Sequence, residues 1–137
     1  MNHFSHVEIL FEGCNEPEKR YQKLIELGRS LDQLPAHQQT EENLVRGCQS
    51  EVFLDAYIQD GKVFFQAASD ALISKGLAAL LLLAYNGQTP EFILKEKPSF
   101  TKTLGIADTL SPGRSNGLAG MYLRMQRLSL KFLSSIS

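Results

Sequence analysis

The strongest constraint on the fold is an alternating stretch that is followed by a two-residue turn. From residue 51 to residue 59, apolar side chains at even positions alternate with other side chains at odd positions, which is the pattern of a half-buried β-strand. Asp60-Gly61 follows, and both residues tolerate the positive φ angles of a type I′ turn. Residues 63–68 can form the returning strand. The sequence therefore predicts an antiparallel β-hairpin.

Helical patterns lie on both sides of this hairpin. Before it, residues 3–12 predict a short amphipathic helix and residues 17–34 a second helix, with a proline in its first turn. After it, Ser69 or Asp70 is expected to cap a largely apolar helix over residues 71–85. Because that helix is apolar on most sides, we expect it to be buried.

The rest of the chain predicts shorter elements and one more long helix. A short helix runs from Pro90 to about Lys95, a turn follows over residues 98–105, and Ser111-Pro112 opens the last helix. A further short strand is expected at residues 43–46. The order of helices, sheet and helices predicts an α+β fold, in which a small antiparallel sheet of about three strands packs against helices. At 137 residues the chain fits one domain, over residues 1–137.

Charge and hydropathy argue against several classes of partner. The net charge is -1 and no cluster of basic residues is present, so neither nucleic acid nor an acidic membrane surface is indicated. The longest apolar stretch, residues 77–85, is too short to span a bilayer, and the N-terminus lacks the features of a signal peptide. Two cysteines do not make a disulfide framework, which favours a reducing, cytoplasmic setting.

Cys48 is the residue on which a functional interpretation depends. It follows Gly47, comes just before the first predicted strand, and lies after the wholly polar residues 38–43. A thiol on a loop at the entrance to a strand is placed to be reached by a partner. Free cysteine also commonly serves as a small buried hydrophobe, so a packing role stays open for Cys48. Cys14, between the first two helices, is interpreted as a packing residue.

The remaining residues limit the chemistry that such a thiol can perform. Cysteine hydrolysis needs a base, and His37 is the one central histidine, without an Asn/Asp partner pattern. Residues 113–117 lack the Lys-Ser/Thr ending of a phosphate-binding loop. Two cysteines and three scattered histidines meet no metal-ligand spacing, so neither a metal nor an organic cofactor is expected. Exchange of sulfur with another protein remains as the chemistry for an exposed thiol.

Two arginines are candidates for stabilising a thiolate at Cys48, because a nearby cation lowers the pKa of a thiol. Arg46 lies two residues before it. Arg114 lies within residues 111–117, a segment of mostly small residues that opens the last helix. This segment either approaches the Cys48 loop with its cation and free N–H groups, or is only a capped helix start.

Four ordered motifs resemble the SufE-like family. The residues from Arg46 to Val52 contain the pattern Gly-Cys-Gln-Ser-x-Val of that family's cysteine loop. The other three matching stretches are Tyr21-x-x-Leu24-Ile25-Glu26-Leu27-Gly28, Ser69-Asp70-Ala71-x-x-x-Lys75-Gly76-Leu77 and Leu110-Ser111-Pro112-x-Arg114-Ser115-x-Gly117-Leu118. Together they extend from about residue 17 to residue 130. Phe53 stands where Trp often follows the motif, and residues 97–100 also differ from the usual pattern.

This resemblance implies a SufE/IscU-like fold and a cytoplasmic sulfur acceptor in iron–sulfur cluster assembly. Such a protein is a covalent carrier rather than an enzyme. It takes persulfide sulfur from a SufS-like cysteine desulfurase, which it stimulates, and passes the sulfur to a SufB-like scaffold. By motif, Cys48 would accept the sulfur, Arg114 would be the cation near it, and Asp70 would lie beside the cysteine loop. The residues expected to support the loop or partner docking are Arg46, Gly47, Gln49, Asp70 and Arg114.

Two alternative functions are compatible with the same fold class. An iron–sulfur cluster scaffold would bind metal itself, but a cluster typically takes about four thiolate ligands and the chain has 2 cysteines. A non-catalytic interaction module would hold Cys48 in its core, where it would react with thiol reagents only on unfolding.

Overall fold

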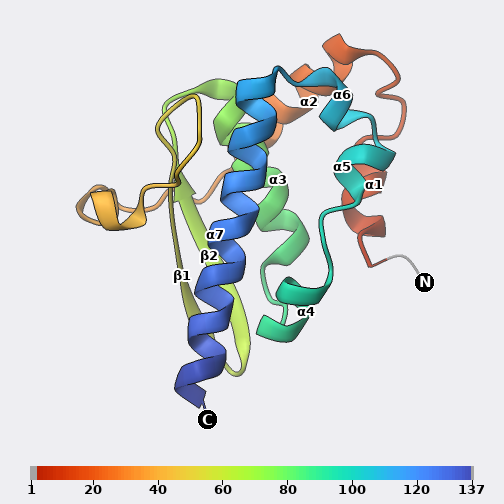
Figure 1. The fold of residues 1–137 in the computed structure, drawn as a ribbon. Helices are drawn as coiled ribbons and strands as arrows, with labels where there is room; N and C mark the ends of the chain where they lie inside the picture. The colour runs from red at the N-terminus through yellow and green to blue at the C-terminus, as the bar shows by residue number, and fades with distance from the viewer. Residues whose placement is uncertain (1–2, 137) are drawn as a thin grey trace.

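The computed structural model describes residues 3–136, and their side chains through residue 134. Figure 1 shows the arrangement of its helices and strands. The helices are α1 (Ser5–Leu10), α2 (Pro17–Arg29), α3 (Leu72–Tyr85), α4 (Pro90–Lys95), α5 (Phe100–Thr103), α6 (Ile106–Thr109) and α7 (Pro112–Ile136). Two 3-10 turns, η1 (Ala36–Gln38) and η2 (Glu41–Asn43), precede the strands β1 (Phe53–Gln59) and β2 (Lys62–Ala68).

The β-hairpin is confirmed, with the predicted turn. β1 and β2 pair antiparallel from Phe53↔Ala68 to Gln59↔Lys62. Asp60 and Gly61 have φ angles of 53° and 75°, as a type I′ turn requires. The predicted alternation of buried and exposed side chains is seen at two positions of β1: the even-numbered Leu54 is buried, whereas the odd-numbered Tyr57 is 49% exposed.

The predicted third strand is wrong. Residues 43–46 form a single bridge, Leu44↔Phe53, and a hydrogen bond from the N–H of Val45 to the carbonyl of Val52 (2.8 Å). The segment cannot extend because its first residue, Asn43, is the last residue of η2, and because Gly47, with φ +83°, turns the chain immediately after it. The described sheet therefore has two strands, in the predicted α+β class.

The predicted cap of α3 is also wrong. Ala71 is the N-cap residue, and no side chain caps the helix there. Asp70 is exposed and Ser69 is used differently. The Ser69 hydroxyl donates to the carbonyl of Glu51 (2.8 Å) and accepts from the N–H of Ala71 (3.3 Å). It thereby joins the start of α3 to the chain just before β1. Helix α6 was not predicted, since the expected turn ended at residue 105.

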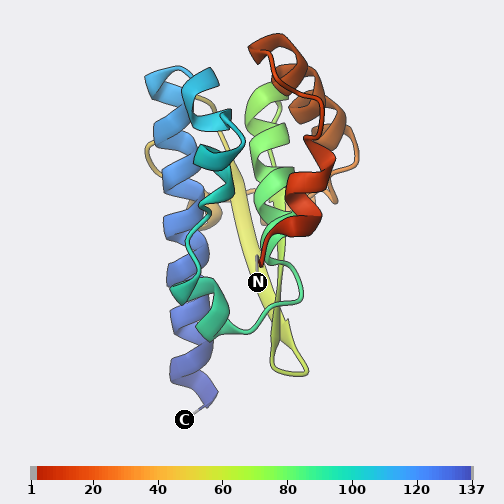
Figure 2. The ribbon, with the colours of Figure 1, turned by 90° about the vertical axis from the view of Figure 1, so that its right-hand side faces the viewer.

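Helices α3 and α7 cover one face of the hairpin, and α2 packs on α3 (Figures 1 and 2). Both helices bury apolar faces: α3 is buried along most of its length, as predicted, and α7 uses one stripe. The buried residues of that stripe are Leu118, Met121, Tyr122, Met125 and Leu128. Arg124 donates from Nε to the carbonyl of Leu54 (2.6 Å) and from Nη2 to Oδ1 of Asn43 (2.9 Å). These bonds fix α7 against β1 and η2.

Helices α2 and α3 approach so closely that no side chain fits between them at one position. A Cβ atom on Gly76 of α3 would overlap the backbone carbonyl of Leu24 in α2, and one on Gly28 would lie 3.0 Å from the nitrogen of Gly76. The pair of glycines thus lets the two backbones touch. Within residues 3–136 no helix is long and apolar enough to cross a membrane.

Candidate functional site

Residues 46–51, here called the cysteine loop, lie beside the N-terminal half of α7 (Figure 1). The hydrogen bond between Val45 and Val52 closes the neck of the loop (2.8 Å). Both valines are buried, so the loop projects from a fixed base. Gly47 has φ +83°, yet a Cβ atom there would have no neighbour within 4 Å. Glycine is therefore required by the left-handed backbone and not by lack of space.

Cys48 is half-buried and its thiol faces α7. The Sγ atom lies 3.7 Å from the carbonyl oxygen of Gly117, to which the thiol donates a long hydrogen bond. The side chain packs against the edge of the hydrophobic core. Burial raises the pKa of the Cys48 thiol above its ordinary value, because an apolar environment disfavours the thiolate. In this conformation Cys48 is thus held as a protonated, sheltered thiol.

This raised pKa makes a prediction for alkylation. Because the thiolate is the reacting species, Cys48 should react with iodoacetamide more slowly near pH 8 than a fully exposed cysteine. The alkylation rate should still rise with pH above 9.0, the ordinary pKa of a cysteine thiol. The pKa of the Cys48 thiol is higher in the folded state than in the unfolded state, so folding favours the protonated thiol. The contribution of this thiol to stability is present below its unfolded-state pKa and is lost as the pH rises through its folded-state pKa. Alkylation rates from pH 6 to 10, followed by mass spectrometry of the Cys48 peptide, would contradict this if Cys48 titrated below pH 8.

The cysteine loop rests on three glycines of α7. Gly113, Gly117 and Gly120 share one side of the helix by their spacing of four and three residues, and we call them the glycine face. A Cβ atom on Gly120 would lie 2.5 Å from the carbonyl oxygen of Arg46, and one on Gly117 would lie 3.4 Å from the Cys48 sulfur. A Cβ on Gly113 would overlap the amide oxygen of Gln49. The loop thus packs directly on the backbone of α7.

The segment 111–117 does approach the cysteine loop, which is one of the two alternatives that the sequence left open. Ser111 caps α7 by accepting from the N–H of Arg114 (3.3 Å), and its hydroxyl also lies 3.5 Å from the amide oxygen of Gln49. Arg114 donates from Nη1 to the hydroxyls of Ser50 (3.2 Å) and Ser74 (2.5 Å). Since Ser74 is buried in α3, Arg114 joins the end of the cysteine loop to both α7 and α3.

The direction of the Cys48 pKa shift differs from the expectation that a nearby cation lowers the pKa of this thiol. The Arg114 guanidinium is bonded to two serine hydroxyls, and burial alone accounts for the direction of the Cys48 shift. Arg46 lies in solvent with a side chain that is 72% exposed, and it pairs with Glu41 at 3.9 Å. An exposed pair of this kind adds little stability. In this conformation the guanidinium groups of Arg114 and Arg46 are bound to two serines and to Glu41, and burial raises the pKa of the thiol.

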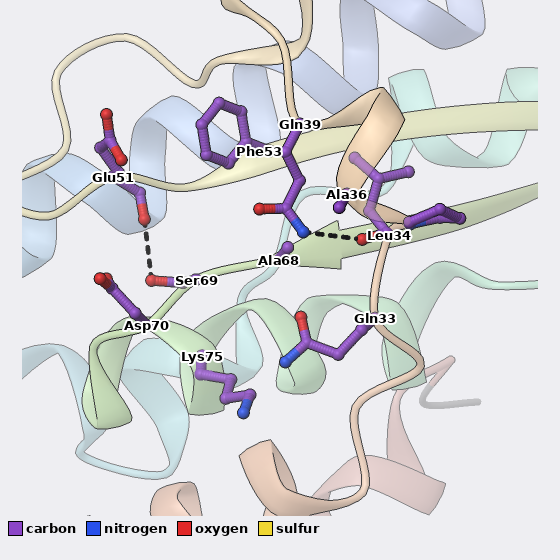
Figure 3. A pocket seen from close by; sticks show the side chains of 11 residues that line it. Gln33, Leu34, Ala36, Gln39, Glu51, Phe53, Ala68, Ser69, Asp70 and Lys75 are labelled. Carbon is purple, nitrogen blue, oxygen red and sulfur yellow. Dashed lines mark hydrogen bonds between the residues drawn. The ribbon is translucent and has the colours of Figure 1, made fainter.

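Asp70 lines a cavity together with Glu51, the last residue of the cysteine loop (Figure 3). The cavity has a volume of about 550 Å³ and lies between the segment 33–39, the beginning of β1 and the beginning of α3. Its charged lining residues are Glu51, Asp70 and Lys75. The bond from Ser69 to the Glu51 carbonyl connects this cavity to the last residue of the cysteine loop. Asp70 is thus placed at the head of α3 near the loop, as the motif implies.

Neither the glycine face nor the serines that Arg114 holds were predicted from the sequence. The spacing of Gly113, Gly117 and Gly120 was a usable signal, because glycine is unfavourable inside a helix and its repeated use on one side indicates close packing. Ser50 belongs to the Gly-Cys-Gln-Ser motif, but nothing in the sequence indicated that it and Ser74 bind Arg114, since only the fold brings them together. Among residues 3–136, no three His, Cys, Asp or Glu side chains are grouped so that they could hold a metal ion.

The fold and the site define an α+β protein built around one cysteine on a loop that is closed against a helix. The chain matches the family model of the SufE, or Fe-S metabolism associated, domain over residues 6–129. It therefore belongs to the SufE family. Membership confirms the predicted resemblance and implies a sulfur-transfer role in iron–sulfur metabolism.

Two relatives and one solved structure support this assignment. The chain is 37% identical over 122 residues to an uncharacterized SufE-like protein of Synechocystis sp., covering 89% of this chain and 77% of that one. It is 38% identical over 122 residues to SufE-like protein 1, chloroplastic/mitochondrial, of Arabidopsis thaliana, covering 88% of this chain but 33% of that longer one. The solution structure of a hypothetical protein from Thermus thermophilus superposes with a TM-score of 0.79, at 28% identity and over 96% of both chains.

Proposed function

We propose that Cys48 accepts sulfur from the persulfide of a cysteine desulfurase and delivers it to an iron–sulfur cluster scaffold. The observation that carries this proposal is the placement of Cys48. It lies on a loop with a fixed base and a glycine beside the cysteine, and its thiol is closed against α7 by one long hydrogen bond. Cys14 is also a half-buried free thiol, but it follows α1 in the short connection to α2 and lies on no comparable loop.

The transfer is a thiolate exchange that needs no external oxidant or reductant. The Cys48 thiolate attacks the terminal sulfur of the partner's cysteine persulfide, and a new sulfur–sulfur bond forms. The bond between that sulfur and the partner's cysteine breaks, and the partner leaves as a thiolate. Cys48 then carries the persulfide. In the second transfer, a thiolate of the scaffold attacks the terminal sulfur of the Cys48 persulfide. The bond between that sulfur and Cys48 breaks, and Cys48 leaves as a thiolate.

The closed conformation has two consequences for this exchange. It protects the thiol from stray reagents, and it also keeps the thiol protonated and out of reach of a second protein. Cys48 must therefore turn outward when a partner docks, and Gly47 is the residue whose backbone can change most freely. Faster alkylation of Cys48 in the presence of the desulfurase would support this step; equal rates with and without it would argue against it.

The partners belong to the proposal. We expect a SufS-like desulfurase to dock over the cysteine loop and Asp70, to be stimulated by the transfer, and a SufB-like scaffold to receive the sulfur. A reducing compartment such as the cytoplasm fits this chemistry, because both cysteines are free thiols. The chain would then act as a carrier and activator and would perform no catalysis of its own.

The direct test is incubation of the protein with a SufS-like desulfurase and cysteine, followed by intact mass measurement. The protein should gain the mass of one or more sulfur atoms, and a reductant should remove it. Peptide mapping should place the adduct on Cys48. An absence of added mass in a reaction where the desulfurase turns over would contradict the proposal, as would an adduct confined to Cys14.

Arg114→Ala should weaken sulfur acceptance more than stability. Its loss frees Ser50 and Ser74 and leaves the end of the cysteine loop unheld, so the rate of sulfur loading should fall by roughly a hundredfold. The free energy of unfolding should fall by about 1.5 kcal/mol, the lower end of the range for hydrogen bonds to a charged group, because both bonds are only partly buried. Loading kinetics and urea unfolding measure the two effects. If stability falls and loading is normal, Arg114 is structural only. Lys19→Ala, an exposed cation of α2, is the matched control.

A further inference from the structure

We infer that Gly120 is a positioning residue for Cys48: the missing side chain at this position of α7 allows the cysteine loop to close, and so sets how often the thiol is available. The consequence for sulfur transfer rests on the proposed function. The closure itself does not, because it can be measured on the isolated protein.

The three members of the glycine face do not meet the loop in the same way. At Gly113 the nearest atom is the amide oxygen at the end of the exposed Gln49 side chain, which can rotate aside, and the Gln49 Cβ at 3.3 Å has to move by only a few tenths of an ångström. At Gly117 a Cβ would lie at ordinary contact distance, 3.4 Å from the Cys48 sulfur. At Gly120 the atom is the carbonyl oxygen of Arg46, only 2.5 Å away, and a backbone atom cannot rotate aside. Gly120 is therefore the member that the loop backbone requires.

The direction in which the loop would move follows from the two residues that flank Arg46 in the chain. Val45, on one side of Arg46, is buried and bonded to Val52, and its Cγ1 atom would lie 3.4 Å from the same added Cβ. Gly47, on the other side, is exposed and has open space around it. A side chain at position 120 must then displace the Arg46 carbonyl together with Gly47. Cys48 is the next residue, so its sulfur moves away from the Gly117 carbonyl.

Gly120→Ala should therefore shift the loop toward its open state. We expect iodoacetamide to alkylate Cys48 about tenfold faster in this variant than in the unsubstituted protein, since overpacking against a backbone atom disfavours the closed state. The global stability should change much less, because alanine favours a helix over glycine and the open loop relieves the contact. A purely structural glycine would give the reverse pattern: lower stability and an unchanged alkylation rate.

Three further variants make the comparison sharp. Gly113→Ala and Gly117→Ala should change the alkylation rate by less than about threefold, because their added Cβ atoms meet a mobile side chain and an ordinary contact. Asn116→Ala gains helix propensity on the exposed side of the same helix and should leave the rate unchanged. Equal acceleration in all four variants would overturn the inference, since a general change in α7 would then be the cause.

Hydrogen exchange on the unsubstituted protein keeps the inference testable if Gly120→Ala does not fold. The amides of residues 46–51 should exchange by an opening that leaves the α7 amides after residue 120 protected. Exchange of the loop only together with α7 would overturn the inference. Failure of sulfur loading from the desulfurase, with the alkylation and exchange results as expected, would instead contradict the proposed function and leave the loop closure intact.

Discussion

The Cys48→Ser protein is expected to gain no sulfur when it is incubated with a desulfurase and cysteine. A serine hydroxyl is not ionised near neutral pH and forms no persulfide, so the exchange has no acceptor. Stimulation of the desulfurase should disappear with it. We expect a loss of at least about a hundredfold in loading rate, limited by the detection of the added mass, because only the thiolate reacts.

Two controls accompany this result. They are the stability of the Cys48→Ser protein and the sulfur loading of the Cys14→Ser protein. Cys48→Ser should fold normally, since the thiol makes one long hydrogen bond, to Gly117, and lies half-buried at the edge of the core. Its unfolding midpoint in urea should stay close to that of the unsubstituted protein. Cys14→Ser should retain both loading and stimulation. Sulfur loading retained by the Cys48→Ser protein would remove Cys48 from the mechanism.

The parts of the fold that were predictable from the sequence are those that short-range patterns determine. The alternation through residues 51–59 and the Asp60-Gly61 turn gave the hairpin, and α4 begins at Pro90 as expected, where the Thr89 hydroxyl caps it by accepting from the N–H of Phe92 (3.2 Å). The error at the start of α3 came from a competing long-range contact, whereas the third strand was prevented by its immediate neighbours, η2 and Gly47. Ser69 does not cap α3 because its hydroxyl bonds the Glu51 carbonyl, 18 residues away in sequence.

The candidate site was predictable to a different extent. The motif singled out Cys48, and the chain between Ser111 and Gly117 was expected near it, which the contacts of Gln49 and Gly117 agree with. The protonation of the thiol was not predictable. It depends on how deeply the packing against α7 and the edge of the core buries the sulfur, whereas the sequence shows only that an arginine is two residues away. Likewise, nothing in the sequence shows that the Arg114 guanidinium donates hydrogen bonds to the hydroxyls of Ser50 and Ser74.

Gly76→Ala should cause the largest loss of stability among the substitutions considered. The added methyl group would overlap the carbonyl of Leu24 and lie within 3.0 Å of that residue's Cβ, and both atoms belong to a buried, fixed part of α2. The two helices would have to separate along the most extensive helix–helix contact of the fold. We expect a loss of about 3 kcal/mol or more in the free energy of unfolding, at the upper end of overpacking effects. The gain in helix propensity, about 1 kcal/mol, opposes this and is smaller.

Gly28→Ala is the matched comparison for Gly76→Ala, because it adds the same methyl group from the opposite helix. Its Cβ would lie 3.0 Å from the Gly76 nitrogen, so a small shift of α2 accommodates it and the expected loss is about 1 kcal/mol. Urea unfolding monitored by circular dichroism measures both losses. A Gly76→Ala protein as stable as Gly28→Ala would show that α2 and α3 can separate freely. The effect should also reach the site: Ser74 lies two residues before Gly76 and holds Arg114, so displacement of α3 should loosen the cysteine loop and speed alkylation of Cys48 in the folded protein.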